Sequence, residues 1–144
     1  RSVWEQIPYP DVDFAEDQMW AKQVIEAGYA KAYANKAVVF HSHTYGFINL
    51  FRRSFEEARA LNRLFGYQLC PTAVQMFGQS ARTIRADFRY FFSAKIPLTE
   101  IIWLLRVPLR NVAKQVGYYL GQRHQRLPEF MVARISIDKS LQRK

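Results

Sequence analysis

Three stretches of the chain repeat their hydrophobic residues at the three-to-four spacing of an amphipathic helix. The first covers residues 47–65, the second begins near Ala73, and the third follows Pro97. Their hydrophobic positions are Phe47, Phe51, Phe55, Ala58, Leu61 and Phe65; Ala73, Phe77, Ala81, Ile84, Phe88 and Phe91; and Ile101, Leu105, Pro108, Val112, Val116 and Tyr119. The pattern therefore predicts amphipathic helices here, interrupted by Gly66 and Pro71, and Pro108 is expected to kink the last helix or to begin a new one.

The beginning of the chain follows a different pattern. The stretch FAEDQMWAKQVIEAGY predicts a helix from about Phe14 to Ala27, with Gly28 as its C-terminal stop. The runs YAKAYA and AVVFH that follow are short and β-prone, and they favour one bent strand or two. The expected fold class is therefore mainly α with a small β element.

These patterns divide the chain into three parts. Residues 1–46 form a small α/β piece, residues 47–126 form an amphipathic helical extension, and residues 127–144 are expected to be an irregular, partly mobile basic tail. With 144 residues, about half of them hydrophobic, the chain is long enough for one modest domain. Its single cysteine, Cys70, excludes an intrachain disulfide and suits a reducing compartment.

The positive charge is unevenly distributed. Residues 1–80 contain 8 Lys and Arg and 8 Asp and Glu, whereas residues 81–144 contain 13 and 4, so the whole net charge of +9 lies in the second half. Such asymmetry favours an anionic partner: membrane phosphate, nucleic acid or a phosphorylated substrate. No stretch approaches the roughly 18 uncharged apolar residues of a membrane span. The sequence shows no signal peptide, and from its first residue, Arg1, it reads like a piece of something longer.

Two adjacent carboxylates, Glu16 and Asp17, stand at the head of the first predicted helix. Asp13 and Glu16 resemble a capping box, and acidic residues in a first turn complement the helix dipole. A carboxylate placed there beside a cleft also suits a general base that takes a proton from an attacking hydroxyl. The residues alone leave both interpretations open. The D-x-D spacing of Asp11 and Asp13 is discounted as a metal motif, because such patterns are frequent by chance and Asp13 fits better as a cap.

His41 and His43 flank one serine in VVFHSH. On a strand, residues two apart point to the same side, so both imidazoles would project together. Neutral imidazoles are good transition-metal ligands, but two ligands do not close a site and no third is visible nearby in the sequence. Hydrogen-bonded histidines at a strand end, or a surface pair, remain alternatives.

Taken jointly, IPYPDVDFAEDQMWAKQVIEAGYAKAYANKAVVFHSHTY resembles the end of the catalytic domain of family 2 glycosyltransferases with the GT-A fold. Within that family it is most similar to the bacterial rhamnosyltransferase-like members that build O-antigen and other polysaccharides. The acidic ED before a helix, then aGy, a strand and HSH, follow the family's order and spacing over about residues 7–55. The stretch GYYLGQRHQRLPEFMVARIS also resembles the ends of such enzymes.

The resemblance implies roles for the residues that match the motifs. Asp17 is the expected catalytic base, with Glu16 its partner, and it would deprotonate an acceptor hydroxyl that attacks and inverts the anomeric carbon of a nucleotide-sugar. His41 or His43, with His41 preferred, would contact the metal–diphosphate region, where the divalent metal is Mg or Mn. Trp20 would line the acceptor site by stacking on a sugar, with core packing as its more common role.

The resemblance also implies a C-terminal fragment of an α/β enzyme, in which residues 1–46 belong to the acceptor side of the catalytic domain. The nucleotide-binding half, with its parallel strands and true D-x-D, is not in this sequence, so the chain alone is expected to be inactive. The implied partners are a nucleotide-sugar donor, held mainly by that other half, and a glycan or polyprenyl-diphosphate-linked acceptor. Rhamnose is one candidate for the transferred sugar, and the resemblance does not define the donor sugar, the acceptor or the linkage.

Two basic stripes lie beside the hydrophobic ones in the predicted helices. Such stripes with many aromatics are typical of helices in a membrane interface, and equally of a soluble bundle with solvated arginines. The first interpretation predicts an anionic membrane partner and a cytoplasmic, peripheral location on the inner face of the cell membrane. The alternative function is a nonenzymatic basic helical module for lipid or nucleic acid, the latter disfavoured because no nucleic-acid motif is recognisable. The stripe residues are Arg82, Arg85 and Arg89, then Arg106, Arg110 and Lys114.

Overall fold

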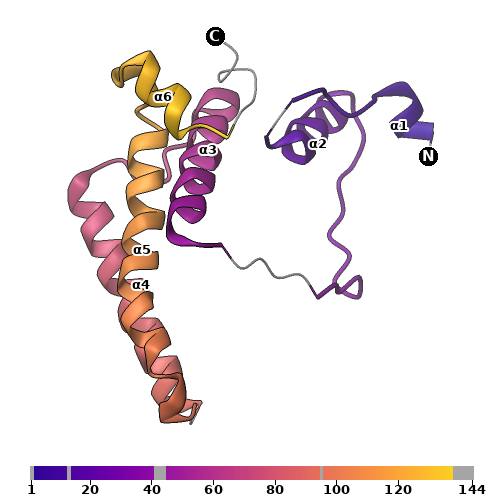
Figure 1. The fold of residues 1–144 in the computed structure, drawn as a ribbon. Helices are drawn as coiled ribbons and strands as arrows, with labels where there is room; N and C mark the ends of the chain where they lie inside the picture. The colour runs from indigo at the N-terminus through magenta and orange to yellow at the C-terminus, as the bar shows by residue number, and fades with distance from the viewer. Residues whose placement is uncertain (1, 13, 41–44, 95, 138–144) are drawn as a thin grey trace. The chain divides into compact units, whose positions relative to one another are not determined.

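The structure is a computed structural model that describes residues 2–12, 14–40, 45–94 and 96–137. The chain divides into two compact units, Arg1–Thr44 and Tyr45–Lys144. Every regular element in the described ranges is a helix (Figure 1). The prediction of a mainly α chain is therefore confirmed, whereas the small β element is not seen in them.

The first unit contains helix α1 (Ser2–Gln6) and helix α2 (Glu16–Glu26). The predicted stop at Gly28 is confirmed, because its backbone has a φ of +89°, the left-handed conformation that glycine adopts at little cost. The start of α2 differs from the expectation of a capping box. Ala15, with a φ of 62°, occupies the N-cap position and provides no side-chain hydrogen bond. Asp13, the expected cap, lies outside the described residues.

Residues 29–40, where one or two strands were predicted, contain no strand. Their backbone hydrogen bonds among the described residues are a turn from Ala37 N to Ala34 O at 3.1 Å and a bond from Tyr29 N back to Val24 O, at the end of α2, at 3.1 Å. The hydrophobic side chains are turned to solvent, and Tyr33 and Phe40 are almost fully exposed. A strand satisfies its main-chain groups only by pairing with another strand, and the described chain offers none. The β-prone composition alone was therefore not sufficient for a sheet.

The second unit begins with helix α3 (Phe47–Phe65), which has the predicted bounds and ends at Gly66 with a φ of +69°. The predicted hydrophobic face is buried at its centre, where Phe55 and Ala58 are inaccessible to solvent. Helix α4 (Ala73–Ser93) follows. Its N-cap is Thr72, whose side chain accepts a hydrogen bond from Gln75 N at 3.1 Å and so satisfies one donor of the first turn.

Helix α5 (Ile102–Gly121) follows the short 3-10 turn η1 (Leu98–Glu100). It continues through Pro108, so no new helix begins there. Figure 1 shows α5 lying beside both α3 and α4, and these are the two helices it contacts most. Gly117 and Gly121 bring the second half of α5 close to the α3 backbone.

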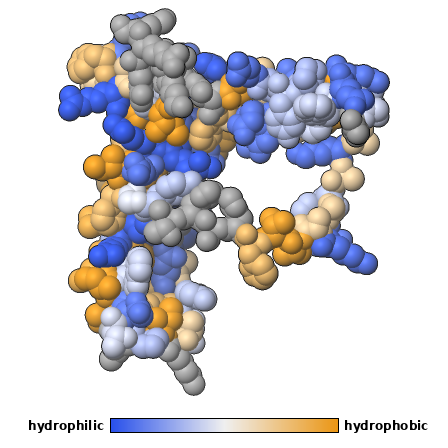
Figure 2. Space-filling model, turned by 45° about the vertical axis from the view of Figure 1, so that its right-hand side comes forward, coloured by the Kyte–Doolittle hydropathy of each residue, from blue (hydrophilic) through white to orange (hydrophobic). Residues whose placement is uncertain are grey.

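The first half of α5 packs on α4, where Asn111 Nδ2 donates a hydrogen bond to Asp87 Oδ2 at 2.8 Å. Here most of the predicted hydrophobic face is exposed: Ile101, Leu105 and Val112, together with neighbouring Leu109, are accessible to solvent. Hydrophobic residues accordingly appear among hydrophilic ones on the surface of this part in Figure 2. Within the described ranges, no helix combines the length and hydrophobicity needed to cross a bilayer.

The region predicted to be an irregular tail is partly helical. Beyond the 3-10 turn η2 (His124–Arg126), residues Glu129–Ile135 form helix α6. Arg52 Nη2 of α3 donates a hydrogen bond to Arg134 O at 2.9 Å, and Ser136 is completely buried. This part of the chain is therefore held by packing on the helices, which its weak hydrophobic pattern did not reveal.

Candidate functional site

The acidic pair lies in the first turn of α2, with Glu16 and Asp17 both exposed. Asp17 Oδ1 accepts a hydrogen bond from the backbone N–H of Gln18 at 2.8 Å. This bond orients the carboxylate while its other oxygen has no partner in the described part of the chain. The arrangement leaves Asp17 accessible to a hydroxyl group from solvent, which a general base requires.

Trp20, one turn after Asp17, ties α2 to the chain that precedes it. Its indole Nε1 donates a hydrogen bond to Ile7 O at 2.6 Å, and its ring stacks on Tyr9 with centroids 4.9 Å apart and planes inclined by 12°. One face of the indole and its only donor are thus occupied by the protein. The structure shows a packing contact for Trp20, and acceptor stacking stays a prediction.

The predicted metal ligands His41 and His43 lie outside the described residues. In the ranges that the structure describes, no three His, Cys, Asp or Glu side chains gather as a metal site would require. The described ranges therefore do not test the predicted metal site, which stays a prediction.

The predicted membrane-binding residues do not all have the same environment. Arg82, Arg85 and Arg89 are exposed on α4. On α5, Arg106 lies over the Trp103 ring at 5.3 Å, and Lys114 lies over an aromatic ring one turn later, that of Tyr118, at 5.6 Å. The remaining residue of this second stripe, Arg110, is half-buried, and its Nη1 donates to Tyr45 O at 2.5 Å. It serves the packing of the second unit, so its charge is less available to a surface than that of the others.

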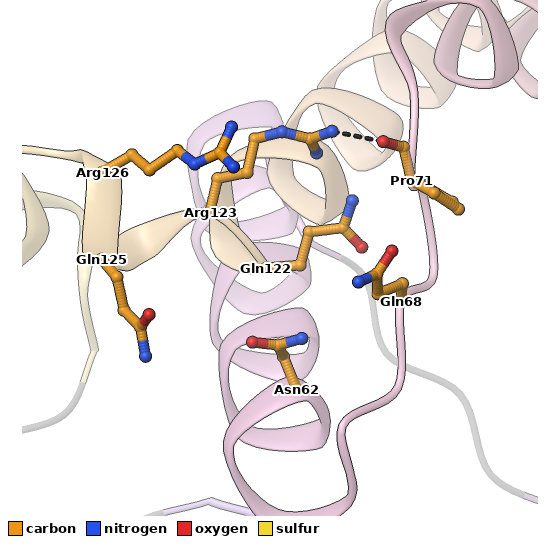
Figure 3. A pocket seen from close by; sticks show the side chains of 7 residues that line it. All are labelled: Asn62, Gln68, Pro71, Gln122, Arg123, Gln125 and Arg126. Atoms are coloured by element: carbon orange, nitrogen blue, oxygen red, sulfur yellow. Dashed lines mark hydrogen bonds between the residues drawn. The ribbon is translucent and has the colours of Figure 1, made fainter.

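A polar pocket of about 310 Å³ lies at the C-terminal end of α5, where sequence reasoning placed no site. Figure 3 shows that its side chains come from the end of α3, from the chain before α4 and from the end of α5 with η2. The lining contains four carboxamides, two guanidinium groups and a proline: Asn62, Gln68, Gln122, Gln125, Arg123, Arg126 and Pro71. The only signal in the sequence was the polar run GQRHQR after a hydrophobic helix.

The wall of this pocket is held by two side chains of α5's end. The Gln122 carboxamide pairs with both backbone groups of Cys70: Oε1 accepts from Cys70 N at 3.0 Å, and Nε2 donates to Cys70 O. Arg123 donates to Cys70 O at 3.2 Å, to Tyr119 O at 3.0 Å and to Pro71 O (Figure 3). Its guanidinium also lies 3.8 Å from the Tyr119 ring centroid. The arginine is therefore fixed in place before any ligand arrives.

The charge around this end of α5 is positive. Burial is the main cause that lowers the pKa of His124, and the cations Arg59 and Arg63 lower it further, against the raising effects of the Gly121 carbonyl and Glu56. Nearby, burial raises the pKa of the Cys70 thiol, an effect that the Arg123 charge partly opposes. The histidine is thus held toward its neutral form by its surroundings.

The chain is similar to two curated proteins that are named for the O-antigen chain. The chain is 30% identical over 135 residues to the O-antigen chain rhamnosyltransferase RfbN of Salmonella typhimurium and, to the same extent, to the O-antigen chain rhamnosyltransferase WbaN of Salmonella anatum. Each match covers 89% of this chain but 39% of the relative, so the chain spans about two fifths of the length of these proteins. No protein-family model and no solved structure matches the chain. The similarity supports the resemblance to bacterial rhamnosyltransferases, while family 2 and the GT-A fold stay predictions.

Proposed function

We propose that this chain is the acceptor-side part of an inverting glycosyltransferase that acts in O-antigen or related polysaccharide synthesis. The enzyme would transfer a sugar, with rhamnose the candidate, from a nucleotide-sugar to a glycan or a polyprenyl-diphosphate-linked acceptor. The observation that carries the proposal is the similarity, over 89% of the chain, to proteins named O-antigen chain rhamnosyltransferases. Because the chain spans 39% of their length, the activity is proposed for the protein that contains this chain.

Asp17 is the residue we assign to the chemistry. The acceptor hydroxyl gives its proton to the Asp17 carboxylate while its oxygen forms a bond to the anomeric carbon from the face opposite the nucleotide. The bond between that carbon and the diphosphate breaks, and the nucleoside diphosphate leaves with the electron pair, which inverts the configuration. The exposed position of Asp17 and its hydrogen bond from Gln18 N support this role. Glu16, beside it in the first turn, adds negative charge.

The divalent metal of the resemblance stays a prediction resting on His41 and His43. Mg or Mn would neutralise charge on the leaving diphosphate. The described residues provide no cluster of ligands for it, and the proton transfer to Asp17 does not depend on it.

The test replaces Asp17 by Asn in the protein that contains this chain. The amide keeps the shape and removes the base, so turnover should fall about 10²-fold or more while donor binding changes little. Glu26→Gln, at the other end of α2, is the control for loss of an exposed carboxylate. Near-normal turnover of the Asp17 variant would leave Asp17 as a helix-start residue only.

A peripheral location on the cytoplasmic membrane surface is the second part of the proposal. Its support is the exposed hydrophobic face on the first half of α5, together with the exposed arginines of α4. A largely apolar pocket of about 250 Å³, lined among others by Tyr90, Phe91 and Trp103, opens between the same two helices. A nonenzymatic lipid-binding module would use the same surface, and the names of the relatives favour the transferase over it.

A further inference from the structure

The polar pocket at the end of α5 contains hydrogen-bonding side chains that have no partner among the described residues. The side chains of Gln122 and Arg123 form their hydrogen bonds with backbone groups of Cys70, Pro71 and Tyr119. In contrast, the side chains of Gln68, Gln125 and Arg126 make no hydrogen bond within the described part of the chain and are exposed. The pocket therefore combines a rigid wall with free donors at its rim.

The positive charge of the pocket is not neutralised by the protein. Arg123 is half-buried, and all its acceptors are neutral carbonyl oxygens. Neither Arg123 nor Arg126 forms a salt bridge in the described ranges, and the pocket lining contains no carboxylate. By contrast, the nearby Arg59 is paired with Glu56 at 2.9 Å. Two guanidinium groups at one pocket without a counter-ion point to an anionic ligand.

The type of anion follows from the donors. Guanidinium groups bind phosphate oxygens through paired N–H donors, and carboxamides add hydrogen bonds to the remaining oxygens or to attached hydroxyl groups. In the view of Figure 3 the side chains of Arg123 and Arg126 both run along one edge of the pocket, above Gln122. The volume of about 310 Å³ lies within the range of small-molecule sites. A neutral sugar would leave both charges uncompensated.

We propose that this pocket binds a phosphate or diphosphate ester. Arg123 provides a fixed positive wall, and Arg126, Gln68 and Gln125 close on the phosphate oxygens from the rim. The same chemistry is present in a soluble phosphorylated compound and in a lipid headgroup. The site lies wholly within the second unit, so it stands independently of the base assigned to Asp17.

The experiment titrates the protein with inorganic pyrophosphate, at constant ionic strength, by calorimetry. Saturable binding is expected, and Arg126→Gln should weaken it by about tenfold, the ratio that corresponds to 1.4 kcal/mol. Arg126 is chosen because it is exposed and holds no backbone group in the described chain, whereas loss of Arg123 would release the wall. The matched control is Lys36→Gln, which removes one exposed positive charge in the first unit and should leave binding unchanged.

Several results would overturn the proposal. They are an absence of saturable binding, an equal loss of affinity in Lys36→Gln, no loss of affinity in Arg126→Gln, or a neutral monosaccharide that competes as well as pyrophosphate.

Vesicles containing phosphatidic acid distinguish the two sources of phosphate. Displacement of the protein from them by pyrophosphate, lost in Arg126→Gln, supports the site with a lipid headgroup as its ligand. Pyrophosphate binding that depends on Arg126, with vesicle binding that does not, supports it with a soluble ester.

Discussion

Gly121 of α5 lies directly against the main chain of Phe55 in α3. A Cβ atom at position 121 would fall 2.9 Å from the Phe55 carbonyl carbon and still nearer to its oxygen. One turn earlier, a Cβ at Gly117 would fall 2.6 Å from Phe51 O. The two glycines therefore let the helix backbones approach closely, and Phe55 is completely buried at this contact.

Replacing Gly121 by Ala should destabilise the second unit. The added methyl group has to displace main-chain atoms, and overpacking of this kind costs about 1–3 kcal/mol. Gly78→Ala is the control, because a Cβ there meets nothing within 4 Å and the helix interior of α4 should gain up to about 1 kcal/mol. Urea unfolding followed by circular dichroism measures both. Equal effects of the two substitutions would refute the close approach.

The sequence was most informative where helix pattern and stop signal agree. Residues 47–65 have a hydrophobic face and a following Gly66, and the helix has those bounds. The same spacing on α5 did not reveal that Ile101 and Leu105 are exposed, because periodicity identifies a hydrophobic face but not what covers it. The prediction of strands was wrong for a related reason. Residues 29–40 have β propensity, but no described strand pairs with them.

The pocket could not be predicted from local pattern. Its lining joins the chain around Gln68 to residues near Gln122, which are far apart in sequence and meet only because α3 and α5 pack through glycines. The acidic pair shows the opposite case. Its place at a helix start was predictable, whereas its chemistry came from the resemblance and stays a prediction.

Gln122→Ala should loosen the chain before α4. The N–H of the buried Cys70 loses its partner, Cys70 O keeps only the hydrogen bond from Arg123, and an unsatisfied buried polar group costs about 1–3 kcal/mol. Cys70 is the only cysteine, so its reaction with a thiol reagent reports the opening directly and should become faster. Gln125→Ala, at an exposed position of the following turn η2, should change neither stability nor labelling. Unchanged labelling of the Gln122 variant would contradict the clamp.

Stability should fall as the pH is lowered through about 6.5, in part because of His124. Its pKa is lowered by folding from the ordinary 6.5, chiefly by burial and also by Arg59 and Arg63, so the unfolded chain binds the proton first. Below pH 6.5 this difference favours the unfolded state, and above it the contribution vanishes. His124→Gln should flatten the decline in melting temperature between pH 7.5 and pH 5.5. An identical decline in both proteins would show that His124 does not contribute.

The exposed face of α5 and the arginines of α4 should attach the protein to anionic membranes without spanning them. Each basic residue near anionic lipid contributes about 1 kcal/mol, so replacing Arg82, Arg85 and Arg89 with Gln should weaken vesicle binding about 10²-fold. The control replaces Lys22, Lys31 and Lys36 with Gln, the same loss of charge in the first unit. Vesicle sedimentation measures the binding.

Salt separates the two contributions to this attachment. Added salt should weaken binding by screening the arginines, yet leave the part that comes from burial of hydrophobic side chains. Leu105→Ser combined with Leu109→Ser should reduce that remaining part, because both leucines are exposed on α5. Equal binding to neutral and anionic vesicles would show that the arginines do not contribute, and no binding to either would indicate a soluble bundle. The exposed face of α5 would then have to be covered by other protein, because such a hydrophobic surface is unfavourable in water.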